Sequence, residues 1–119
     1  SRRKTTEKVY EDNRVKCVTY EEINDIKGDI IVNATPVGMY PKIDASPVEE
    51  DIINNFNVLI DIVYNPRMTK FLQIGKKLNK KICGGMEMLV GQAIKSEEIW
   101  QNMKVEDKVF EEIYNYIDK

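Results

Sequence analysis

Two segments decide the fold: Asp29-Ile-Ile-Val-Asn-Ala-Thr35 and Val58-Leu-Ile-Asp-Ile-Val-Tyr64. Each is a nearly continuous run of apolar residues, and each ends at a proline-containing turn, Pro36 to Pro41 after the first and Asn65-Pro66 after the second. Such runs are typical of strands that are buried on both faces of a parallel sheet. The sequence therefore predicts two parallel strands with loops at their carboxyl ends.

Amphipathic segments alternate with these runs, as expected of βα units in an α/β protein. Ser46-Pro47 followed by acidic residues predicts a helix start, and the i+4 repeat from Val105 to Ile117 predicts a terminal helix. The predicted helices cover residues 4–13, 46–56, 68–78, 86–101 and 105–117, and two further short strands are predicted at 16–20 and 80–83.

The composition is that of one ordinary globular domain. Of 119 residues, 42% are hydrophobic and 32% are charged, which excludes a disordered chain as the default. The net charge of -2 gives no global basic field, so we expect no nucleic-acid partner. The apolar runs fall far short of the roughly 20 residues that span a bilayer, so we expect no membrane segment.

Cysteine and histidine usage narrows the chemistry. Cys17 and Cys83 are too few for a disulfide scaffold and lack the close Cys or His neighbours of a zinc site, so no metal is predicted and a reducing cytoplasm is the simplest location. The absence of histidine excludes Ser-His-Asp and Cys-His schemes. The start at Ser1 shows neither an initiating Met nor a signal peptide, so we expect a piece of a longer protein.

Candidate functional residues cluster at three places. In an open parallel sheet, ligands bind beyond the carboxyl ends of the strands. The segments that qualify are Asn33 to Gly38, Asp61 to Pro66 with Thr69, and Gly84 to Ala93. Each segment alone also fits a purely structural role: turn chemistry for its Pro and Gly residues, a helix N-cap for Thr69, or core packing for its Met and Leu residues.

Together and in this order, the three segments resemble the nucleotide-binding domain of shikimate dehydrogenases. The matching residues are Asn33, Ala34, Thr35, Gly38, Asp61, Tyr64, Pro66, Thr69, Gly85, Met88, Leu89, Gln92, Ala93 and Trp100. The resemblance implies an incomplete doubly wound Rossmann-type parallel sheet with flanking helices, lacking the first two strands and the Gly-rich loop. Residues 1–119 would then be the carboxyl-terminal part of a dinucleotide-binding domain, including terminal helices over about 86–119.

The resemblance also implies a set of NADP-binding residues. Ser1, Arg2, Arg3 and Lys4 stand where the family holds the adenosine 2'-phosphate, although Ser1 replaces an Asn and Arg3 a Thr of the family pattern. A guanidinium can make paired hydrogen bonds to a phosphate. A solvated basic start of a surface helix is the alternative. The remaining implied cofactor contacts are Ala34, Thr35, Pro36, Ile62, Gly85 and Met88, and for Met88 core packing is a close alternative.

Two residues match substrate contacts of the family, Tyr64 and Gln92. The Gln92 amide could serve as both donor and acceptor to the hydroxyls of shikimate. The alternatives are an exposed helical Gln and a half-buried Tyr at a strand end. No catalytic residue is assigned, because the family's Lys and Asp pair is expected upstream; Asp61 is expected to orient neighbouring backbone.

The resemblance implies NADPH-dependent, reversible reduction of 3-dehydroshikimate to shikimate in aromatic amino-acid biosynthesis. The chain alone would be inactive, and its partners would be the small-molecule substrate and the missing amino-terminal substrate domain, with a homodimer left open. Two alternatives remain at this point: a quinate/shikimate dehydrogenase paralogue using NAD or NADP, and a non-catalytic nucleotide-binding or interaction module.

Overall fold

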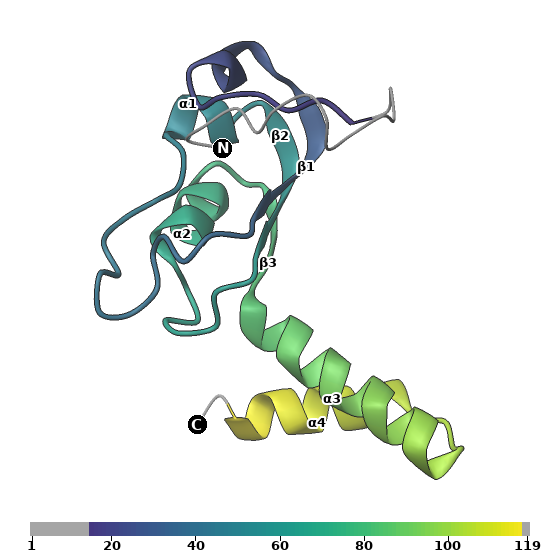
Figure 1. Cartoon of the computed structure of the whole chain (residues 1–119). Helices are drawn as coiled ribbons and strands as arrows, with labels where there is room; N and C mark the ends of the chain where they lie inside the picture. Colours follow the sequence, from purple (N-terminus) through teal and green to yellow (C-terminus); the bar gives the residue numbers. More distant parts are fainter. Residues whose placement is uncertain (1–14, 118–119) are drawn as a thin grey trace.

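The computed structural model describes residues 15–117, drawn in colour in Figure 1. Ser1 to Lys4 and the predicted helix over 4–13 lie outside the described residues. The elements are the 3-10 helix η2 (Glu22–Asp25), β1 (Gly28–Asn33), α1 (Glu50–Ile53), β2 (Phe56–Asp61), α2 (Lys70–Lys77), β3 (Lys81–Cys83), α3 (Gly85–Gln101) and α4 (Asp107–Ile117).

The strands form one parallel sheet in the order β1-β2-β3. The register aligns Asn33 of β1 with Asp61 of β2, so the polar ends of the two apolar runs lie side by side. This arrangement confirms the predicted parallel sheet with flanking helices. It also puts the loops that follow β1 and β2 at the same edge.

One face of the sheet carries the core. Leu59 of β2 packs with Phe71 and Leu72 of α2 and with Ile53 of α1, and all four are almost completely buried. Helix α2 lies so close against the sheet that a Cβ at Gly75 would lie only 2.5 Å from a methyl group of Leu59. The core therefore fixes the direction in which β2 ends.

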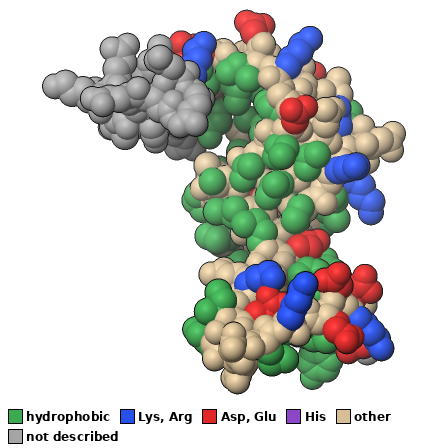
Figure 2. Space-filling view, turned by 90° about the vertical axis from the view of Figure 1, so that its right-hand side faces the viewer, with side chains coloured by type: hydrophobic (Ala, Val, Ile, Leu, Met, Phe, Trp, Pro, Cys, Tyr) green, Lys and Arg blue, Asp and Glu red, His purple; other side chains and the backbone are tan. Residues whose placement is uncertain are grey.

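On the other face, strand residues are more open. Ile30 and Val32 of β1 are 54% and 51% exposed, and Ile62 after β2 is 43% exposed. In Figure 2, hydrophobic side chains (green) form a patch in the middle of the view, above the two carboxyl-terminal helices. These helices, α3 and α4, pack against each other and extend away from the sheet (Figure 1).

Two predicted elements differ from the structure. Residues 16–20 form no strand, because Thr19 instead bonds to the first residue of η2: its N–H and its hydroxyl both donate to the Glu22 carboxylate, at 2.8 and 3.1 Å. The helix predicted over 46–56 is reduced to α1, since the Ser46 hydroxyl donates to the Val48 carbonyl at 2.6 Å and does not cap a helix.

Candidate functional site

A buried polar network joins the ends of β1 and β2. The Asp61 carboxylate, which is completely buried, accepts hydrogen bonds from the Asn33 amide at 3.1 Å, from the Thr69 hydroxyl at 2.6 Å and from the Val63 N–H at 3.0 Å. The Thr69 hydroxyl in turn accepts from the Leu72 N–H and caps α2. Asp61 thus orients neighbouring backbone, as expected, and its oxygens are occupied by structural partners.

The same network shapes the loop after β1. The Asn33 side-chain oxygen accepts from the N–H and the hydroxyl of Thr35, and its NH2 group donates to the Val37 carbonyl at 3.2 Å. Gly38 has a φ of 91°, and a Cβ there would lie 2.9 Å from the carbonyl oxygen of Ala45. The hydrogen bonds of Asn33 and the conformation of Gly38 therefore give residues 34–38 a defined loop structure.

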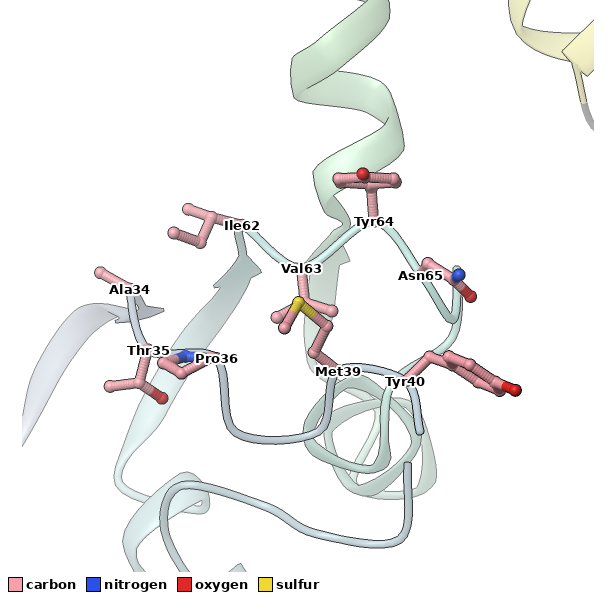
Figure 3. Close-up of a pocket in the computed structure, with 9 residues that line it drawn as sticks. All are labelled: Ala34, Thr35, Pro36, Met39, Tyr40, Ile62, Val63, Tyr64 and Asn65. Carbon is pink, nitrogen blue, oxygen red and sulfur yellow. The ribbon is translucent and has the colours of Figure 1, made fainter. Parts of the chain in front are cut away.

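A cavity of about 410 Å³ lies between this loop and the loop after β2. Its lining residues are Ala34, Thr35, Pro36, Met39, Tyr40, Ile62, Val63, Tyr64 and Asn65, which Figure 3 draws on the two loops. Five of the predicted ligand contacts are thus brought together: Ala34, Thr35, Pro36, Ile62 and Tyr64. The structure places them at the carboxyl ends of the strands, where ligands bind in open parallel sheets.

Sequence reasoning missed Met39 and Tyr40 as lining residues. Tyr40 belongs to the site because its N–H donates to the Asn65 carbonyl at 2.9 Å, which ties the two loops together. Both side chains are exposed, at 46% and 66%. Large apolar side chains between two prolines of a loop were the available signal.

Helix α3 begins directly beside the cavity. The Gly85 N–H donates to the Val63 carbonyl at 3.2 Å, and a Cβ at Gly85 would collide with the Ile62 carbonyl oxygen and lie 2.6 Å from the carbonyl carbon of Val63. Only a residue without a side chain allows this approach. Gly85 therefore holds the start of α3 against the wall of the cavity.

The remaining two predicted contacts lie farther along α3. Met88 is 46% exposed and Gln92 is exposed, and neither lines the cavity. The exposure of Met88 does not fit a core residue of the described part of the chain. Both side chains are available to a ligand that extends from the cavity along the first turns of α3.

The chemistry of this site is that of binding. The lining offers apolar side chains, peptide groups and the phenols of Tyr40 and Tyr64.

Burial, and then the nearby Glu87 carboxylate, raise the pKa of the Cys83 thiol, so this cysteine is a poor nucleophile at neutral pH. Among residues 15–117, no group of three or more metal-ligating side chains comes together, and no helix is long and apolar enough to span a membrane.

Comparison with known proteins shows extensive similarity to shikimate dehydrogenases. No family model matches the chain. Over 107 residues it is 63% identical to the shikimate dehydrogenase (NADP(+)) of Clostridium beijerinckii, a match that covers 90% of this chain. Among solved structures, shikimate dehydrogenase 1 of Peptoclostridium difficile superposes with a TM-score of 0.71 at 57% identity over 83% of this chain. A chorismate mutase/shikimate 5-dehydrogenase fusion protein of Clostridium acetobutylicum gives 0.77 at 39% identity over 84%.

The similarity covers most of this chain but a minor part of each relative. The chain spans 40% of the Clostridium beijerinckii protein and 37% of each of the two solved chains. Over that part it is homologous to shikimate dehydrogenases, and the solved structures confirm a partial Rossmann-type fold. The resemblance drawn from the ordered sequence segments is thereby confirmed.

Proposed function

We propose that this chain is the carboxyl-terminal part of the NADP-binding domain of a shikimate dehydrogenase, an enzyme that interconverts 3-dehydroshikimate and shikimate in aromatic amino-acid biosynthesis. The observation that carries the proposal is the cavity at the ends of β1 and β2, which collects five of the ligand contacts that the family resemblance implies, in a chain 63% identical to an enzyme of that name over 107 residues. In this proposal, residues 1–119 form one unit whose terminal helices cover about 86–119. The sequence has only two cysteines, Cys17 and Cys83, too few for a disulfide scaffold, and this favours a cytoplasmic location.

The cavity is assigned to the cofactor. NADPH supplies a hydride when it is bound. In the proposal, the loop residues Ala34, Thr35 and Pro36 and the side chain of Ile62 form the apolar bed along which the cofactor lies. Gly85 lets the helix start approach the cofactor's carboxamide, and Met88 packs near its ring.

The substrate is assigned to the neighbouring surface. Tyr64, which lines the cavity and is 54% exposed, and Gln92, on the exposed side of α3, would contact the hydroxyls of shikimate. The described lining residues provide no Lys and Asp pair for proton transfer. The proposal therefore places that pair in an amino-terminal substrate domain, which is the partner this chain requires for activity.

Tests of the proposal use a complete enzyme made by replacing the matched part of the Clostridium beijerinckii relative with this chain. This chain and the part that it replaces are 63% identical over 107 residues. This protein is called the complete enzyme below. Its NADP-linked oxidation of shikimate is the direct test of the proposed function.

Replacement of Arg2 and Arg3 together by Ala is expected to raise the KM for NADP about tenfold to a hundredfold in the complete enzyme. A charge-assisted hydrogen bond to a phosphate contributes roughly 1.5 to 3 kcal/mol. NAD lacks the 2'-phosphate, so its KM should stay within about twofold of the unmodified enzyme. Equal increases for both cofactors in steady-state kinetics would remove the phosphate role of these arginines.

Gln92→Ala is expected to raise the KM for shikimate about fivefold to a hundredfold, because the substrate hydroxyls lose a partner worth roughly 1 to 3 kcal/mol in a closed site. NADP affinity, measured by calorimetry, should remain near normal. Gln101→Ala is the matched control, since this exposed Gln ends the same helix far from the cavity. Unchanged shikimate kinetics in Gln92→Ala would show that Gln92 does not contact the substrate.

A further inference from the structure

Tyr114 of α4 is the point where three parts of the chain meet. Its hydroxyl donates a hydrogen bond of 3.0 Å to the Glu87 carboxylate in the first turn of α3. The guanidinium carbon of Arg67, from the loop after β2, lies 4.4 Å from the centre of the Tyr114 ring. Phe110, one turn earlier on α4, stacks on the same ring at a centroid distance of 6.3 Å. Tyr114 therefore joins α4 to both segments beside the cavity.

Glu87 carries this contact to the beginning of α3. One oxygen of its carboxylate accepts from Tyr114, and the other accepts from the Gly84 N–H at 3.0 Å. The second bond satisfies a backbone donor at the amino end of α3, where such donors have no partner within the helix. A single carboxylate thus links the cap of α3 to the side chain from α4.

The start of α3 is also fixed to the loop after β2. Gly85 donates to the Val63 carbonyl, and a Cβ at Gly84 would lie 3.4 Å from the Arg67 carbonyl oxygen. Val63 lines the cavity, and Arg67 follows two residues after Asn65, which lines it too. Any tilt of α3 at this base therefore changes the position of the cavity wall.

The contacts of Tyr114 fix the position of its side chain, because each is directional. A hydrogen bond to a carboxylate is stronger than one between neutral groups, and a guanidinium over an aromatic ring adds an attraction with a defined direction. Burial, followed by the hydrogen bond to Glu87, raises the pKa of Tyr114. The phenol therefore keeps its proton, and its donor function, throughout the neutral range.

We propose that Tyr114 is a positioning residue that holds, through Glu87 and Arg67, the start of α3 at a fixed distance from the loop after β2. By this route a residue on α4 sets the position of the cavity wall at Val63, whose carbonyl accepts from the Gly85 N–H. The assignment of NADP as the ligand of that cavity rests on the function proposed above.

The test compares Tyr114→Phe with Tyr116→Phe in the complete enzyme. The phenyl ring that remains in Tyr114→Phe keeps the stacking on Phe110 and the ring contact with Arg67, while the hydroxyl's hydrogen bond to Glu87 and its own interaction with Arg67 are lost. Tyr116 lies on the same helix, is 79% exposed and makes no hydrogen bond to another described residue, which makes it a matched control. We expect Tyr114→Phe to raise the KM for NADP about threefold to tenfold with kcat within twofold, and Tyr116→Phe to change neither.

A second arm asks whether the effect passes through Glu87. Glu87→Gln leaves only one oxygen to serve two donors, so Tyr114→Phe should raise the KM by less than twofold in that background. Hydrogen exchange at the Gly84 and Gly85 amides should be faster in Tyr114→Phe than in Tyr116→Phe, and this measurement does not depend on which ligand binds.

The outcomes separate the two proposals. If neither the complete enzyme nor its variants oxidise shikimate, the proposed function is contradicted. The exchange rates at Gly84 and Gly85 would still show whether Tyr114 fixes the start of α3. Unchanged exchange in Tyr114→Phe overturns the positioning role. Faster exchange together with an unchanged KM for NADP in an active enzyme also overturns it, because Tyr114 would then stabilise the fold without setting the position of the cavity wall.

Discussion

Gly85→Ala is expected to lower the free energy of unfolding of the complete enzyme by about 2 to 4 kcal/mol and to weaken NADP binding at the same time. A Cβ at this position collides with the Ile62 carbonyl oxygen and comes within 2.6 Å of the Val63 carbonyl carbon, both of them backbone atoms that cannot rotate away. Overpacking of this kind costs about 1 to 3 kcal/mol. Loss of the hydrogen bond from Gly85 to Val63 adds roughly 1 kcal/mol.

Gly91→Ala is the matched control on the same helix. Its Cβ would meet the Phe110 ring at 3.7 Å, an ordinary van der Waals distance. Alanine inside a helix is favoured over glycine by roughly 1 kcal/mol, so this variant should be unchanged or slightly more stable. Urea unfolding of both variants measures the difference. Equal stabilities would show that the start of α3 does not press on the cavity wall as described.

The parallel sheet was predictable because the sequences of β1 and β2 are nearly continuous apolar runs. Val58 to Ile60 and Ile30 to Val32 both form strands, and the prolines that follow them mark where the strands stop. Burial of both faces was wrong for β1, since Ile30 and Val32 are 54% and 51% exposed. The strand expected at 16–20 was wrong because local hydrogen bonding prevailed. The Thr19 hydroxyl donates to the Glu22 carboxylate three residues away, and such short-range side-chain hydrogen bonds compete with strand formation.

The sequence predicted where the candidate site lies better than it predicted which residues line it. The loops after β1 and β2 meet because parallel strands end at one edge, and this alone brings Thr35 and Tyr64 to one cavity. The participation of Tyr40 depends on its backbone bond to Asn65, which no sequence pattern encodes. The same holds for Tyr114, whose contact with Glu87 spans 27 residues and depends on how α4 folds back along α3.

The largest expected effect concerns the chain by itself. Residues 1–119 alone should oxidise shikimate at least about 10⁴-fold more slowly than the complete enzyme, because a positioned acid or base contributes about 10² to 10⁴ and correct placement of cofactor and substrate contributes further. The lining of the cavity holds no Lys and Asp pair that could substitute. The chain should also bind NADP weakly, since the proposal assigns it only part of the cofactor's contacts.

The most direct measurement of the central claim is NADP reduction, followed by absorbance with shikimate as substrate and recorded for three samples: the complete enzyme, the chain of residues 1–119 alone, and the complete enzyme carrying Gln92→Ala. The account predicts NADP-dependent turnover by the complete enzyme, a raised KM for shikimate in Gln92→Ala and no turnover by the chain alone. Two results would contradict the account: stoichiometric shikimate oxidation by the purified chain, or a folded complete enzyme that binds neither NADP nor shikimate. Either result would show that this chain does not form part of an active site that an amino-terminal domain completes.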